Sequence, residues 1–280
     1  MKIAVLSDIH GNLPALHAVV EHLAAWQPDQ VVVNGDTVNR GPSSMAVWQF
    51  VQTQPDWHVL KGNHEVYVIG HQSGEGVENG RLFALNYLSY WTYLQHQCEV
   101  TALDQLLDGL SLFGPDGSEV RFRHASMKNN RDAVWEASPL DTLRRQIGEG
   151  AAVFATAHTH WTFVRQIDKT LLVNSGSVGT PADDDPRASY AQLTWRQGQW
   201  SAQTIRLPYD REAARQDYKT SGFLAEAGPV GWLVFHEWQE AHEIAYTWMQ
   251  LYYEAIMAGE IELETAVTDY LATLGLPLPV

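Results

Sequence analysis

Residues 2–12, Lys2-Ile3-Ala4-Val5-Leu6-Ser7-Asp8-Ile9-His10-Gly11-Asn12, decide the fold class. The first six residues of this stretch predict a short buried strand, and residues 13–26 continue with apolar side chains at helical spacing. A short apolar strand that ends in a polar, glycine-bearing turn returns at residues 31–36 and again at residues 57–64. Strands that alternate with helices in this way predict an α/β domain.

The middle of the chain predicts a helical insertion followed by more strands. Helical periodicity covers residues 78–96, and a second short helix is predicted for residues 100–110. Strand patterns with alternating polarity or hairpin spacing then return between residues 119 and 205. We therefore expect an α/β domain over residues 1–207 that carries a helical insertion at residues 66–117.

Residues 208–280 predict an acidic and aromatic-rich helical extension. The longest periodic segment, residues 231–257, indicates one long helix, and residues 262–274 indicate a last one. The long helix carries more large apolar side chains than a single buried stripe of a monomer needs. We expect this surface either to pack over residues 1–207 or to form a homo-oligomer contact.

The charge of the chain argues against two classes of partner. The sequence has 18 Lys and Arg against 33 Asp and Glu, a formal net charge of −15. A protein that coats nucleic acid neutralises phosphates with Lys and Arg, so this composition excludes that class. Residues 220–280 contain nine acidic residues and no Lys or Arg, which argues against binding to a membrane surface.

The sequence predicts a cytoplasmic location. Its single cysteine, Cys98, cannot form an intrachain disulfide. The apolar run at the start meets Asp8 too early for a signal peptide, and no run approaches the roughly 18 to 20 apolar residues of a membrane-spanning helix.

Residues that can bind metal ions follow five of the predicted strands. Alternate residues of an extended chain point to the same side, so a pair such as Asp8 and His10 can reach one ion. The candidate ligands are Asp8, His10, Asp36, Asn63, His124, His158 and His160. For the position of His124, His71 and His96 are rivals. Four imidazoles, two carboxylates and an amide oxygen suit two divalent transition-metal ions, Mn²⁺ first and Fe, Zn or Ni as alternatives, better than Mg²⁺ or Ca²⁺.

Such a site predicts a phosphate substrate. The charge of two divalent ions exceeds that of the two carboxylate ligands, so the site would be positively charged in an otherwise acidic protein. A carboxylate can bridge two ions about 3.5 to 4 Å apart, and such a pair can clamp an in-line displacement at phosphorus while ionising a bridging water. We expect a small phosphate ester to bind there.

The order of these motifs resembles that of the calcineurin-like metallophosphoesterases. The matching motifs are Asp8-x-His10, Gly35-Asp36-x-x-x-Arg40-Gly41-Pro42, Gly62-Asn63-His64-Glu65, a single His124 and His158-x-His160. The resemblance covers about residues 1–207 and is closest to the branch that holds phosphoprotein phosphatases and dinucleoside tetraphosphatases. It implies a two-sheet β-sandwich flanked by helices.

The resemblance also implies how the ligands divide between two ions. One ion would be held by Asp8, His10, Asp36 and His160, and the other by Asp36, Asn63, His124 and His158. Asp36 would therefore bridge the two ions.

Three residues, one of them also a predicted ligand, resemble the part of the family's site that handles substrate. By the resemblance, His64 is the general acid that protonates the leaving oxygen, and Arg40 and Asn63 join it in binding substrate. Two positions depart from the family pattern: Ala157 replaces a glycine, and Asn39 replaces an aspartate that pairs with the acid histidine. A neutral amide cannot stabilise an imidazolium as a carboxylate does, which puts strong acid assistance by His64 in question.

The sequence thus predicts a metal-dependent phosphoesterase that hydrolyses a phosphate mono- or diester by attack of a metal-bridging hydroxide. The alternative from another class is a non-catalytic scaffold or binding protein on the same fold. Among enzymes, phosphatase and phosphodiesterase activities remain open, as do phosphoprotein and dinucleoside polyphosphate substrates.

Overall fold

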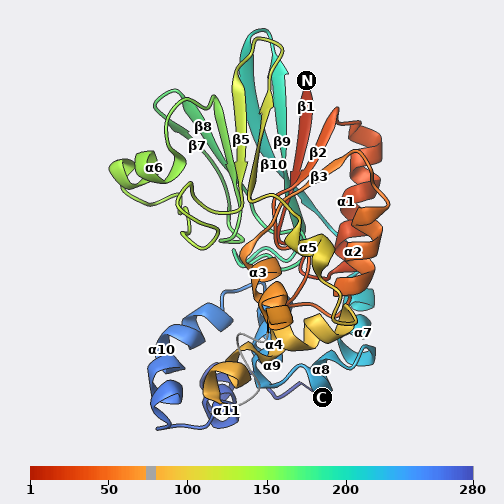
Figure 1. Cartoon of the computed structure of the whole chain (residues 1–280), viewed down its shortest axis with the longest axis vertical. Coiled ribbons are helices and arrows are strands. Elements are labelled where there is room, and N and C mark those ends of the chain that lie inside the picture. Colours follow the sequence, from red (N-terminus) through yellow and green to blue (C-terminus); the bar gives the residue numbers. More distant parts are fainter. Residues whose placement is uncertain (74–79, 280) are drawn as a thin grey trace.

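The computed structural model describes residues 1–73 and 80–279. Its ten strands form two mixed five-stranded sheets, and helices flank them and gather at one end of the molecule (Figure 1). This is the predicted two-sheet sandwich with flanking helices and a helical C-terminal region.

The first sheet has the strand order β10-β9-β1-β2-β3. Its strands are β1 (Lys2–Leu6), β2 (Gln30–Val33), β3 (Trp57–Val59), β9 (Ala188–Arg196) and β10 (Gln199–Leu207). Strands β1, β2 and β3 run parallel, with Val5 opposite Val32 and Val32 opposite His58. Helices α1 (Leu13–Trp26) and α2 (Ser44–Gln52) return the chain between these strands. The parallel order brings the turns that follow the three strands to one edge of the sheet.

The second sheet has the strand order β4-β5-β6-β8-β7. Its strands are β4 (Gly109–Phe113), β5 (Glu119–Arg123), β6 (Val153–Thr156), β7 (Thr162–Ile167) and β8 (Thr170–Ser175). Helix α6 (Leu140–Ile147) connects β5 to β6, which pair in parallel. The ends of β5 and β6 therefore also lie side by side.

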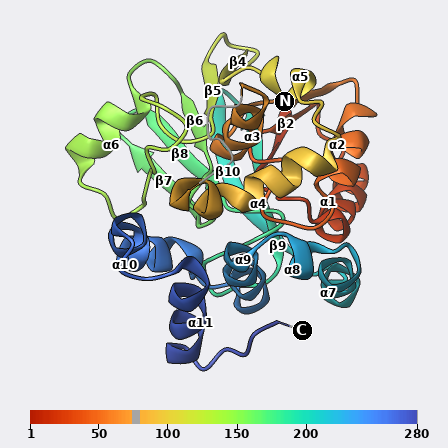
Figure 2. The ribbon, with the colours of Figure 1, turned by 60° about the horizontal axis from the view of Figure 1, so that its bottom comes forward.

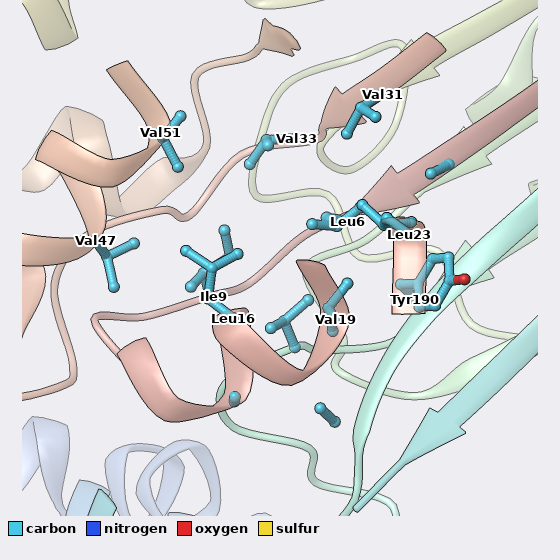
Figure 3. Close-up of a cluster of buried hydrophobic side chains, with 14 residues drawn as sticks. Leu6, Ile9, Leu16, Val19, Leu23, Val31, Val33, Val47, Val51 and Tyr190 are labelled. Carbon is cyan, nitrogen blue, oxygen red and sulfur yellow. The ribbon is translucent and has the colours of Figure 1, made fainter. Parts of the chain in front are cut away.

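Two layers of apolar side chains hold this part of the fold together. Between the sheets, Ile3 and Val5 of β1 belong to one buried cluster with Phe122 of β5 and Val153 of β6. On the other face of the first sheet, a second cluster packs β1 and β2 against α1 and α2 (Figure 3). Because β1 is covered on both faces, its sequence is a continuous apolar run rather than an alternating one.

The remaining helices form a layer beside the ends of the sheets. They are α3 (Asn63–Ile69), the 3₁₀ turn η1 (Gly70–Ser73), α4 (Arg81–Gln95), α5 (Thr101–Asp104), α7 (Arg211–Thr220), α8 (Phe223–Glu226), α9 (Pro229–Glu240), α10 (Ala245–Ala258) and α11 (Leu263–Thr273). The C-terminal helices pack on α4, and α9 lies beside α4 (Figure 2). Leu88 and Trp91 of α4 share one buried cluster with Tyr218 and Trp238. The large apolar side chains of residues 208–280 are thus partly covered within the chain.

Two predicted helices are wrong in extent. Residues 100–110 form only the short helix α5, because β4 begins at Gly109 and pairs with β5. Residues 231–257 form two helices instead of one: Ala241 adopts a left-handed conformation with φ 53° that ends α9. The predicted helix over residues 78–96 corresponds to α4, and its first two residues lie outside the described residues.

Within the described residues, none of the helices combines the length and the apolar character needed to cross a membrane.

Candidate metal centre

The turns after β1 and β2 are joined by backbone hydrogen bonds. The N–H of Asp8 donates to the carbonyl of Gly35 at 3.1 Å, and the N–H of His10 donates to the carbonyl of Asp36 at 3.1 Å. A side chain could not replace the hydrogen of Gly62 in the next turn, since a Cβ atom there would lie 2.1 Å from Asp36 Oδ1. The loops are therefore held at a spacing that brings their polar side chains together.

Five of the seven predicted ligands have a left-handed backbone. The φ angles are 49° for Asp8, 48° for His10, 55° for Asp36, 70° for His158 and 60° for His160. Non-glycine residues are rare in this region because it brings Cβ close to the backbone, and such strain concentrates at functional sites. The clustering of these angles marks the ends of β1, β2 and β6 as a built site.

Asp8, His10 and His160 form the first ligand cluster. The Nδ1 atoms of His10 and His160 lie 3.2 Å and 2.6 Å from the carbonyl oxygens of Asn39 and Thr180. A carbonyl only accepts, so each Nδ1 carries the hydrogen and each neutral ring has its lone pair on Nε2. These two Nε2 atoms are 3.2 Å apart, and Nε2 of His160 is 3.2 Å from Asp8 Oδ1.

Asp36, Asn63, His124 and His158 form the second cluster. Nδ1 of His124 donates to the carbonyl of Asn34 at 2.8 Å, which again directs an Nε2 lone pair into the site. That Nε2 lies 3.2 Å from Asp36 Oδ2 and 3.0 Å from Asn63 Oδ1. His158 completes the group, with a ligand atom within 4.8 Å of those of Asp36 and His124.

The buried carboxylates supply the clearest evidence that cations fit here. Asp8 Oδ1 and Asp36 Oδ2 are buried and have no hydrogen-bond partner, although each faces imidazole nitrogens. The carboxylate oxygens and the imidazole lone pairs are all hydrogen-bond acceptors, so a cation between them would stabilise the arrangement. Without one, burying an unpaired carboxylate destabilises the fold. Ligands about 2.1 Å from one ion lie about 3.0 to 3.4 Å apart, which matches these separations.

Asp36 occupies the position between the two clusters. Its Oδ2 lies 3.7 Å from Nε2 of His10 and 3.2 Å from Nε2 of His124. Burial lowers the pKa of His124, but the negative charge of Asp36 outweighs that effect and raises the pKa to about 10. The negative charge of Asp36 therefore favours a positive charge at this position, which a bound cation would supply.

The rivals of His124 lie elsewhere. Nε2 of His71, in η1, bonds to the hydroxyl of Ser89 at 2.8 Å, and His96 follows the end of α4. Neither belongs to a group of potential ligands among the described residues. The structure therefore brings His124, and neither rival, to the side of Asp36.

His64 lies against the first cluster, with its ring 4.9 Å from that of His10. Oδ1 of Asn39 accepts hydrogen bonds from the Arg40 N–H at 2.9 Å and the Thr92 hydroxyl at 3.0 Å. The NH₂ of Asn39 consequently faces His64 and donates to its Nδ1 at 2.9 Å. The hydrogen of His64 is then on Nε2, and burial lowers the pKa of this ring to about 3. His64 is a neutral hydrogen-bond donor in this arrangement.

Arg40 is paired with a residue that sequence reasoning missed. Its guanidinium forms an ion pair with Glu237 of α9, whose side chain is 4% exposed. The second carboxylate oxygen of Glu237 accepts from the N–H groups of Ile244 and Ala245 at 3.0 and 2.9 Å, where α10 begins. Nothing in a helical acidic segment distinguishes Glu237 from its neighbours, so no sequence signal could have identified this contact.

Glu65, part of a quoted motif but given no role there, fastens the ligand loops together. Its carboxylate accepts four backbone N–H groups, those of Asp36, Thr37, Val38 and Gly62, at 2.7 to 3.2 Å. Burial and the charge of Asp36 raise the pKa of Glu65 to about 7, while these hydrogen bonds oppose the rise.

Two of the cavities beside the clusters are lined by both Arg40 and His158. The smaller, about 140 Å³, is lined by Arg40, His158, His160 and Glu237 among others. The larger, about 340 Å³, is lined by Asn63, His64 and His158 and by the helices α4, α9 and α10. A small molecule can therefore reach the predicted ligands Asn63, His158 and His160 and the predicted substrate-binding residues Arg40 and His64.

Comparison with known proteins agrees with this arrangement. The model of the calcineurin-like phosphoesterase superfamily domain matches residues 1–198. An uncharacterized protein of Methanocaldococcus jannaschii is 28% identical over 230 residues, which cover 76% of this chain and 89% of that protein. A symmetrical bis(5'-nucleosyl)-tetraphosphatase of Psychromonas ingrahamii is 32% identical over 90 residues, covering 30% of this chain and 32% of that enzyme.

Among solved structures, a metallophosphoesterase from Sphaerobacter thermophilus has a similar fold. It superposes with a TM-score of 0.62 at 24% identity, over 79% of this chain and 95% of that one. This similarity supports the fold described above.

Proposed function

The chain belongs to the calcineurin-like phosphoesterase superfamily, and we propose that it is a dinuclear metal-dependent enzyme that hydrolyses a phosphate mono- or diester. The observation that carries the proposal is the pair of buried, unpartnered oxygens, Asp8 Oδ1 and Asp36 Oδ2, each facing imidazole nitrogens. Such a donor set suits divalent transition ions, with Mn²⁺ the first choice.

The two clusters support the division of ligands between two ions. Asp8, His10 and His160 would hold one ion, Asn63, His124 and His158 the other, and Asp36 would belong to both. When bound, the ions would supply positive charge at the phosphate and lower the pKa of a water that serves as nucleophile. The backbone hydrogen bonds of the His10, His124 and His160 rings fix their tautomers for this task.

Arg40 and His64 are proposed to handle the phosphate and the leaving group. The Arg40 guanidinium lines both cavities and can donate to the equatorial phosphate oxygens. His64 carries its hydrogen on Nε2 and can donate it as a hydrogen bond to the leaving oxygen. Because the ring is neutral, this assistance is weaker than that of an imidazolium held by a carboxylate.

A non-catalytic scaffold on the same fold is the competing function. A protein that only binds a partner has no chemical need for seven matched donors, two of which are buried carboxylates. The short alignment with a tetraphosphatase supports a dinucleoside polyphosphate as one substrate class. Phosphoprotein substrates are the other class implied by the motif Gly62-Asn63-His64-Glu65.

Hydrolysis of chromogenic phosphate esters tests the proposal. We expect the protein loaded with Mn²⁺ to hydrolyse p-nitrophenyl phosphate or its bis ester, and the metal-free protein to be inactive. Replacing Arg40 by Met should lower turnover without changing the metal content, which separates phosphate binding from metal binding. Inactivity with every divalent metal and every ester would favour the scaffold.

A further inference from the structure

The two cavities described above differ in character and share Arg40, Arg131, His158 and Tyr246. The smaller one, about 140 Å³, is lined by the ligand His160 and by two acidic residues, Glu237 and Glu243. The larger one, about 340 Å³, continues away from the ligands between α4, α9 and α10. A molecule bound at the shared residues can extend into the larger space.

The position of His64 indicates which part of a substrate occupies the larger cavity. His64 and Asn39 line the larger cavity and do not line the smaller one. The Nε2–H of His64 is the donor proposed for the leaving oxygen. The group attached to that oxygen therefore lies on the His64 side, in the larger cavity.

The walls of the larger cavity are mostly apolar. Its apolar residues come from three helices: Leu85 and Leu88 from α4, Val230 and Val234 from α9, and Ala245, Trp248 and Met249 from α10. The polar side chains of α4 are already engaged within the helix, since Asn86 donates to the carbonyl of Leu82 and Ser89 to that of Asn86. The helical walls of the cavity thus offer burial, while Arg131, Tyr67 and Tyr246 add polar groups to its lining.

We propose that this cavity binds an apolar, ring-sized alcohol portion of the phosphate ester, with the phosphate at the shared residues. The inference rests on the proposed function and specifies its substrate class. A volume of about 340 Å³ lies at the lower end of the range for small-molecule sites, which fits one ring system better than a protein segment. The C-terminal helices α9 and α10, outside the matched residues 1–198, would then determine specificity.

Binding of phosphonates, which cannot be hydrolysed, tests the inference without requiring turnover. We would titrate the full chain loaded with Mn²⁺ with 2-phenylethylphosphonate, ethylphosphonate and inorganic phosphate by calorimetry. The two phosphonates present the same charged group, so a difference reports the ring alone. Burial of a phenyl ring predicts a dissociation constant about ten- to a hundredfold lower for the phenyl compound.

Substitutions in the cavity wall test whether the preference for the phenyl compound arises in the larger cavity. Ala245→Phe fills the cavity and should weaken 2-phenylethylphosphonate about tenfold or more while leaving ethylphosphonate unchanged. Leu251→Phe, which adds the same ring at an exposed position of α10, is the matched control and should change neither. Met249→Gln, which keeps the side-chain length but adds a polar group to the wall, is the second variant and should reduce the preference.

The outcomes separate the two proposals. Equal binding of both phosphonates, or a preference that Ala245→Phe and Met249→Gln leave intact, would overturn the apolar cavity and leave the phosphoesterase standing. Failure of the loaded chain to bind phosphate or either phosphonate would overturn both.

Discussion

The ion pair between Arg40 and Glu237 should couple the C-terminal helices to the candidate metal centre. The side chains of the two residues are only 16% and 4% exposed, and Glu237 also accepts the two N–H groups at the start of α10. Removing one partner of a buried pair leaves the other charge without compensation. We expect Glu237→Ala to lower the free energy of unfolding by about 3 to 5 kcal/mol.

The second substitution, Arg40→Met, gives the coupling energy. In Arg40→Met the Glu237 carboxylate keeps its two backbone donors, so the loss should be smaller, about 1 to 3 kcal/mol. The double variant has neither charge, and its loss should fall short of the sum of the single losses by about 1.5 to 3 kcal/mol. Glu237→Gln is a further variant. Its loss of free energy of unfolding should be smaller than that of Glu237→Ala, because an amide of the same shape can still accept a hydrogen bond.

Equilibrium unfolding in urea, followed by tryptophan fluorescence on metal-free protein, measures the free energies of unfolding of the wild-type protein and the four variants. The chain has 11 tryptophans, among them the buried Trp238 and Trp248, so their emission reports unfolding of the chain including this region. Single losses that add within about 0.5 kcal/mol would refute the reasoning, because they would show that the two side chains do not interact.

Three further results are expected. Asn39→Asp should strengthen acid assistance by His64 and raise the ratio of alkyl to aryl phosphate turnover by about ten- to a hundredfold at fixed metal occupancy; an unchanged ratio would remove the general-acid role. Truncation after Leu207 should expose the apolar faces of α4 and leave a protein that aggregates in size-exclusion chromatography, whereas a fully active, well-behaved monomer would contradict the packing of α9 on α4. Glu65→Gln places an amide NH₂ against backbone donors and should cost about 2 to 4 kcal/mol in urea unfolding, and an unchanged transition would show that the four hydrogen bonds to this carboxylate matter little.

The first half of the fold was accessible from sequence because its signals are local. The helix predicted over residues 13–26 has those bounds in the structure, where Asn12 accepts the Ala15 N–H and so begins α1. The predicted strands at residues 2–7 and 31–33 correspond to β1 and β2. Short apolar runs that end in polar turns determine these elements without help from distant residues.

The sequence also predicted that the seven candidate ligands lie close together. Each residue comes just after a strand, and parallel pairing of β1 with β2 and of β5 with β6 places these ends together. Sequence could not show which of His71, His96 and His124 joins them, since that depends on the pairing of β5.

Contacts across long sequence separations could not be predicted. The helix predicted over residues 231–257 breaks at Ala241, and Glu237 accepts the N–H groups that start α10 while it binds the distant Arg40. The apolar spacing of that segment continues through the break, so periodicity alone predicts one helix. Strand β4 was missed for a similar reason, because its pairing with β5 outweighs local helical preference.

The number of metal ions bound by one chain tests the central claim most directly. Calorimetric titration of metal-free protein with Mn²⁺, with the bound metal counted by elemental analysis, should give two ions per chain. Asp36→Asn, which replaces the carboxylate shared by both clusters with a neutral amide, should bind fewer ions and lose turnover by orders of magnitude. One ion per chain in the wild-type protein, or two retained ions with near-normal turnover in Asp36→Asn, would contradict a dinuclear centre bridged by Asp36.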